Sequence, residues 1–119
     1  MLDEIDLLAL AWDSLVEGLQ QLSLPAEKQV QKLRGTYVAD ELADDFCSIA
    51  MPCARELIQH EWLSKGQYEA LARIEEALQK MSKAQDKSIW EEKALYEAAA
   101  WEECRKMALK VLTEMQAEV

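Results

Sequence analysis

Residues 3–22 read DEIDLLALAWDSLVEGLQQL, and this stretch decides the fold of the chain. Its large apolar residues recur at gaps of three and four: Ile5, Leu8, Trp12, Leu15, Leu19 and Leu22. This spacing is typical of an amphipathic helix with one buried side. The same stretch holds five acidic residues and neither Lys nor Arg, so the outer side of the helix carries only negative charge.

Helical patterns continue through the next part of the chain. Pro25 suits the first turn of a short second helix that stops at Gly35, and Thr36 can cap a third helix. The apolar series of this third helix is Val38, Ala39, Leu42, Phe46, Ile49, Cys53 and Leu57. Pro52 lies inside that series and predicts a kink or a split there, because proline removes a backbone donor and crowds the preceding turn.

Two capping-box patterns mark the helices of the second half. Ser64 with Gln67 precedes a fourth helix, and Ser88 with Glu91 precedes a last helical region. Residues 97–101, EAAAW, form either continuous helix or a corner between two helices, and helix propensity favours continuity.

The sequence therefore predicts an all-α protein, a compact bundle of five or six helices in a single domain over residues 1–119. Half of the residues are apolar, and three Gly and two Pro are too few for a multi-stranded protein. The predicted inner positions are Ile5, Leu8, Trp12, Leu15, Leu42, Phe46, Ile49, Leu71, Ile74, Leu78, Ala108 and Leu112.

The net charge of −10 limits the possible partners. Such an acidic surface repels nucleic acid phosphates and anionic lipid heads, and it attracts basic proteins. The N-terminus lacks the basic start and apolar run of a signal peptide, and no stretch is apolar enough to span a membrane. We therefore expect a cytoplasmic protein that binds a basic protein, with no nucleic acid and no membrane partner.

No pattern in the sequence offers an active site. The cysteines, Cys47, Cys53 and Cys104, form no C-x-x-C pair and are expected to be free thiols packed in the core. His60 is the only histidine, expected near the surface at a helix end with no obvious catalytic partner. We expect neither a metal nor a cofactor, and no enzymatic activity.

The acids near residue 40 add a second acidic segment. Asp40 with Asp44, and Glu41 with Asp45, are like-charged pairs one helical turn apart, which destabilise a helix by about 0.2–0.5 kcal/mol each. Such a face is either simply solvated or a docking surface for a basic partner. The candidate contact residues of both segments are Asp3, Glu4, Asp6, Asp13, Glu17, Asp40, Glu41, Asp44 and Asp45.

The order of landmarks over residues 36–115 resembles a known class of proteins. The landmarks are DELADDF, then WLSKGQYEALARIEEALQKMS, then IWEEKAL and WEECRKMALKVL. Together they resemble small all-helical bacterial immunity proteins of polymorphic or contact-dependent toxin systems. The resemblance implies a protein without catalysis that binds and blocks the C-terminal catalytic domain of a toxin.

The resemblance and the charge lead to one hypothesis and two rivals. Many such toxins are nucleases with basic substrate surfaces, so an acidic inhibitor gains in association rate and specificity. The first rival is a structural or adaptor bundle without a toxin partner, whose acids serve solubility alone. The second is a small helical enzyme or cofactor binder, which requires a polar cluster inside a pocket.

Overall fold

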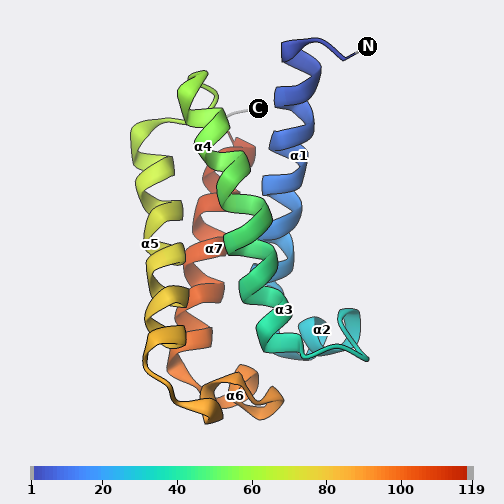
Figure 1. The fold of residues 1–119 in the computed structure, drawn as a ribbon, viewed down its shortest axis with the longest axis vertical. Helices are drawn as coiled ribbons and strands as arrows, with labels where there is room; N and C mark the ends of the chain where they lie inside the picture. Colours follow the sequence, from blue (N-terminus) through green and yellow to red (C-terminus); the bar gives the residue numbers. More distant parts are fainter. Residues whose placement is uncertain (1, 118–119) are drawn as a thin grey trace.

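The computed structural model describes residues 2–117, which are all-α and contain no strand (Figure 1). Seven α-helices are joined by one π-helical and one 3₁₀ segment. They are α1 (Glu4–Ser23), α2 (Ala26–Lys32), α3 (Val38–Asp45), the π-helix η1 (Phe46–Ala50), α4 (Met51–Gln59), α5 (Lys65–Lys83), the 3₁₀ helix η2 (Lys87–Trp90), α6 (Glu92–Glu97) and α7 (Ala99–Ala117).

The predicted helical bundle is confirmed. The segments α3, η1 and α4 follow one another without a break, and we call this continuous helix, residues 38–59, the rod. Counted with the rod as one helix, the described chain has six α-helices. The long helices α1 and α5 pack against the rod, α7 packs against α1 and α5, and the short helices α2 and α6 lie together at one end (Figure 1). None of the helices within residues 2–117 combines the length and apolar character that crossing a membrane requires.

The apolar seam of α1 is buried over most of its length but not at its beginning. Leu8, Leu15 and Leu19 lie in the core, and Trp12 is partly buried against it. The prediction for Ile5 is wrong, because 67% of this residue is exposed. The first turns of α1 extend past the other helices, so the seam continues there without a described element to cover it (Figure 1).

The π-helix explains why the prediction that Ile49 is buried is wrong. Ile49 is exposed, whereas Ala50, Met51 and Ala54 are fully buried. The Met51 N–H donates to the carbonyl of Phe46, a bond across five residues instead of four. This wider turn shifts the buried side relative to the 3.6-residue period. The helix is thus interrupted as Pro52 predicts, but the interruption lies just before the proline.

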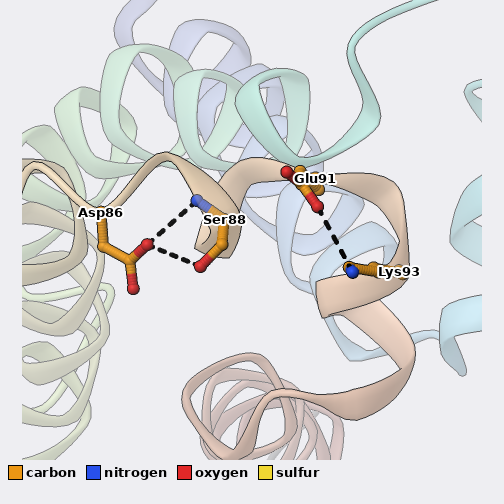
Figure 2. Close-up of polar contacts among 4 residues, drawn as sticks. All are labelled: Asp86, Ser88, Glu91 and Lys93. Atoms are coloured by element: carbon orange, nitrogen blue, oxygen red, sulfur yellow. Dashed lines mark hydrogen bonds and ion pairs between the residues drawn. The ribbon is translucent and has the colours of Figure 1, made fainter.

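One of the two predicted capping boxes is confirmed. The Gln67 N–H donates to the Ser64 hydroxyl, and the Ser64 N–H donates to the Gln67 side chain. The prediction for Ser88 is wrong: this residue donates from its backbone and its hydroxyl to the Asp86 carboxylate (Figure 2). Asp86 therefore caps the short helix η2, and Glu91 forms an ion pair with Lys93 instead of closing a box.

Residues 97–101 form a corner and not the continuous helix that propensity favours. Ala98 has extended backbone angles and separates α6 from α7. Tertiary hydrogen bonds fix this corner: Arg105 Nη1 donates to the carbonyl of Leu95 at 2.7 Å, and Trp101 Nε1 donates to the carbonyl of Ile89 at 2.8 Å. The Trp101 ring is fully buried and meets the Trp90 ring edge to face at a centroid distance of 5.7 Å.

A buried glutamine closes the C-terminal end of α1. The Gln29 side chain of α2 is fully buried and donates to the carbonyls of Gln21 at 3.2 Å and Leu22 at 2.9 Å. The last carbonyls of a helix lack partners within it, so this amide satisfies two of them. The second helix is thereby attached to the first.

Candidate acidic surface

The acids at the beginning of α1 are exposed, and two of them have local structural partners. Asp3 is the N-cap residue of α1, and its Oδ1 accepts the Asp6 N–H at 2.9 Å. Glu4 Oε1 lies 2.9 Å from Nδ1 of His60, at the end of α4. The helix start is therefore held both by its own cap and by a contact across to the rod.

The remaining acids of α1 point outward without an ion-pair partner among the described residues. Asp6, Asp13 and Glu17 are exposed. Glu17 reaches a groove of about 270 Å³ between α1 and the rod, which it shares with Asp45 and Ile49. Asp45 is half-buried there and accepts a hydrogen bond of 2.8 Å from Gln21 Nε2, so part of its function is to join α1 to α3.

The acids of α3 divide between its two sides. Asp40 and Asp44 are exposed and line a second groove, of about 380 Å³, whose far wall includes Leu78 and Trp90. Asp44 Oδ1 accepts the Ser48 hydroxyl at 3.1 Å, and Glu41 is half-buried. The structure thus brings Asp45 to Glu17 and places the pair Asp40 and Asp44 on a different groove, so the nine candidate acids do not form one cluster.

The cations of the chain pair elsewhere. Within residues 2–117, every ion pair of a Lys or Arg lies between residues 55 and 106. The shortest joins Arg55 of α4 to Glu75 of α5 at 2.8 Å. Among the described residues, Glu4 is the one candidate acid of the nine with an ion-pair partner, and that partner is His60. The negative charge of α1 and α3 is therefore largely uncompensated within the described chain.

His60 lies at a helix end near the surface, as the sequence predicts, but it has neighbours that the sequence does not reveal. Glu56 Oε1 lies 3.3 Å from its Nε2, on the opposite side of the ring from Glu4. Both ring nitrogens can donate at once only when the imidazole is protonated. The arrangement suits a structural tie between α1 and α4.

The three cysteines are free thiols, and Cys104 is buried in the core as predicted. Cys47 and Cys53 are only half-buried against the core, so the prediction of full core packing is wrong for these two. Burial raises the pKa of the Cys104 thiol to about 11, and the charge of Glu103 adds to this effect. Burial also raises the pKa of Cys47, with a further increase from the carboxylates of Glu75 and Asp44. Burial raises the pKa of Cys53 as well. Because the thiolate is the reactive form, none of these environments favours a nucleophile.

Two features of the surface are not anticipated from the sequence. Leu7 and Leu10 fall outside the apolar seam of α1 and are exposed beside its acids. A groove of about 610 Å³ lies between α5 and α7, with Arg73, Lys106 and Lys110 along it and two glutamates among them. The sequence spacing of Leu7 and Leu10 is enough to place them outside the apolar seam of α1. The groove cannot be predicted in this way, because it forms only where α5 packs on α7.

The site within residues 2–117 is therefore an acidic surface with two shallow grooves. In the described part of the chain, no group of three or more His, Cys, Asp or Glu side chains is arranged to hold a metal ion. No protein-family model, curated protein or solved structure matches the chain.

Proposed function

We propose that this protein is an inhibitory binding protein, a cytoplasmic immunity protein that neutralises a bacterial toxin domain. In this proposal the acids of α1 and α3 bind a basic surface of the toxin, most readily that of a nuclease. The protein acts by occupying this surface and carries out no reaction of its own.

One observation carries the proposal: the uncompensated charge of α1 and α3. Asp6, Asp13 and Glu17 lie in the solvent without a described cation, although the chain has 13 Lys and Arg residues in all. A surface that needs only solubility gains a few tenths of a kcal/mol from each Glu–Lys pair one turn apart, as α5 and α7 do. The acids of α1 and α3 form no such Glu–Lys pairs among the described residues, which is consistent with selection for an external basic partner.

The physical benefit lies mainly in the rate of association. Complementary charge steers two proteins together and raises association rates by about 10- to 1000-fold. An inhibitor that must bind a toxin before the toxin meets its substrate needs such a rate. An acidic surface also competes directly with the phosphates that a nuclease binds.

The partner to test is the C-terminal domain of the protein encoded directly upstream of this gene. The two proteins are produced together and purified through a tag on that domain. We expect a stoichiometric complex and loss of the domain's enzymatic activity at one equivalent of this protein. If the purified domain neither binds this protein nor loses activity with it, the immunity proposal is contradicted and a structural adaptor becomes the better account.

A further inference from the structure

The first turns of α1 expose apolar side chains to an unusual extent. Leu2, Ile5, Leu7 and Leu10 are each more than half exposed, and they are four of the nine large apolar residues that the described chain exposes. Ile5 continues the inner seam, whereas Leu7 and Leu10, three residues apart, are neighbours on the outer side of α1. Single exposed apolar residues are ordinary on a protein surface, but adjacent ones suit an interaction site. We call residues 2–10 the projecting segment, because the first turn of α1 extends beyond the ends of α4 and α5 (Figure 1).

The projecting segment is an ordered helix end. Asp3 caps it, Leu8 buries its side chain in the core, and Glu4 contacts His60 of the rod at 2.9 Å. Its orientation is therefore set before any partner arrives. A preorganised element loses less conformational entropy on binding, which favours affinity.

Apolar and acidic residues are combined on the outward side of this segment. Leu7 and Leu10 are three residues apart, and Ser14, four residues further, lines the groove that contains Glu17 and Ile49. Asp6 and Asp13 lie beside these leucines and have no ion-pair partner among the described residues. Leu7 and Leu10 thus lie on the side of α1 that leads to the groove, with Asp6 and Asp13 beside them. The groove itself is mainly polar, with Ser14, Glu17, Gln21 and Asp45 in its lining.

The exposed leucines and the carboxylates beside them together limit which partner can bind the projecting segment. A second copy of this chain, paired through the same segment, would place the carboxylates of one copy against those of the other. An anionic membrane surface would be repelled for the same reason. A basic protein segment avoids both costs if it presents an apolar stripe between Lys and Arg side chains.

We propose that the projecting segment is the anchor of the interface, and that its partner presents an apolar stripe bordered by Lys and Arg. Leu7 and Leu10 of α1 pack against that stripe, which lies on a helix or in a groove of the partner. Asp6 and Asp13 pair with the bordering cations. The inference rests on the proposed function, which it deepens by naming the contact. The acids govern how fast the complex forms, and the leucines govern how slowly it dissociates.

The test uses the full chain and synthetic helical peptides of equal length in a two-by-two design. The peptides carry either Leu or Ser along one side, and either Lys or Glu along the borders. Their binding is measured by fluorescence anisotropy to the wild type, to Leu7→Ser/Leu10→Ser, and to the control Tyr96→Ser/Leu109→Ser. The control residues are 52% and 53% exposed, against 55% and 52% for Leu7 and Leu10, and they lie on α6 and α7.

We expect the Lys–Leu peptide to bind the wild type most tightly. Its affinity should fall about 10-fold or more for Leu7→Ser/Leu10→Ser, as for buried interface anchors, and change little for the control. Equal affinity of the wild type and the leucine variant overturns the anchor. The acidic-surface proposal survives that result if Lys peptides still bind better than Glu peptides, and it fails if they do not.

Two further outcomes also overturn the anchor. One is the absence of any binding by the Lys–Leu peptide. The other is sedimentation of the wild type as a dimer that Leu7→Ser/Leu10→Ser dissociates, because the occupant would then be a second copy. Circular dichroism of both variants establishes that their helices are intact.

Discussion

Gly18 of α1 lies so close to Ala50 of the π-helix that a Cβ placed on Gly18 stands 2.9 Å from the Cβ of Ala50. Ala50 is fully buried and has no flexible side chain that could move aside. The absence of a side chain at position 18 therefore sets how closely α1 approaches the rod. The groove that holds Glu17 and Asp45 lies along this same contact.

We predict that Gly18→Ala destabilises the protein. Alanine favours a helix by about 1 kcal/mol over glycine, but overpacking a close contact costs about 1–3 kcal/mol. We expect a net loss of up to about 2 kcal/mol in the free energy of unfolding, measured by urea denaturation. Gly66→Ala is the control, because nothing lies within 4 Å of its Cβ position and it should not destabilise. Equal effects of the two substitutions would contradict the close contact.

We predict that Gln29→Ala weakens the attachment of α2 to α1. The substitution removes both hydrogen bonds to the carbonyls of Gln21 and Leu22 in a fully buried site. The carbonyl of Gln21 keeps the Leu24 N–H, but the buried carbonyl of Leu22 loses the Gln29 amide, which costs about 1–3 kcal/mol, so thermal unfolding should shift to lower temperature. The exposed Gln31 of the same helix provides the control, and Gln31→Ala should stay within about 0.5 kcal/mol. Equal stability of the two variants would show that the Gln29 cap contributes nothing.

We predict that Leu71→Ala costs about 2–5 kcal/mol, because the side chain is fully buried and its loss leaves a cavity. The comparison is Leu109→Ala on α7, where the leucine is 53% exposed. Chemical denaturation of both variants gives the difference. A loss below about 0.5 kcal/mol for Leu71→Ala is typical of a surface residue and would contradict the burial of this face of α5.

We predict that Cys104 makes the stability fall at alkaline pH. Its pKa is about 11 in the folded protein, against an ordinary value of 9.0, so the folded state favours the protonated thiol. The contribution is fully present below about pH 9 and is lost between about pH 9 and 11, as the unfolded chain releases its proton first. At 1.36 kcal/mol per pKa unit, the loss is on the order of 2–3 kcal/mol.

The measurement is the free energy of unfolding against pH for the wild type and Cys104→Ala. Tyr and Lys side chains titrate in the same range, but they are common to both proteins, so the difference between the curves isolates the thiol. The two curves should converge above about pH 9. Parallel curves up to pH 11 would contradict the raised pKa of Cys104.

The sequence predicts the helices well because their apolar periodicity and caps are local. The seam of α1 and the Ser64 box need only neighbouring residues, and both are found in the structure, except at Ile5. The corner at Ala98 depends on Arg105 binding the carbonyl of Leu95, a contact that no local propensity encodes. The π-helix at Phe46 likewise changes the period within one helix and moves Ile49 outward.

The candidate site is less predictable than the fold. Net charge and spacing indicate which acids fall outside the apolar seams, and seven of the nine are exposed. They do not indicate that Asp45 bonds to Gln21 or that Asp40 and Asp44 belong to a different groove from Glu17. Those relationships arise only when α1, the rod and α5 pack together.

The most direct test of the central claim is the rate of association with the proposed partner, the C-terminal domain of the protein encoded directly upstream, measured by stopped flow against ionic strength. The wild type is compared with Asp6→Lys/Asp13→Lys/Asp44→Lys and with the control Glu69→Lys/Glu97→Lys/Glu103→Lys, all exposed acids. Each set of three reversals changes the net charge from −10 to −4, so only the position of the charge differs.

We expect the α1 and α3 reversals to slow association by about 10-fold or more at low salt, since steering contributes about 10- to 1000-fold. The control should be much less affected. The curves should converge at high salt, where the Debye length falls to about 3 Å at 1 M. If both sets slow association equally, or neither does, the acids of α1 and α3 are a solvated face and the docking account is wrong.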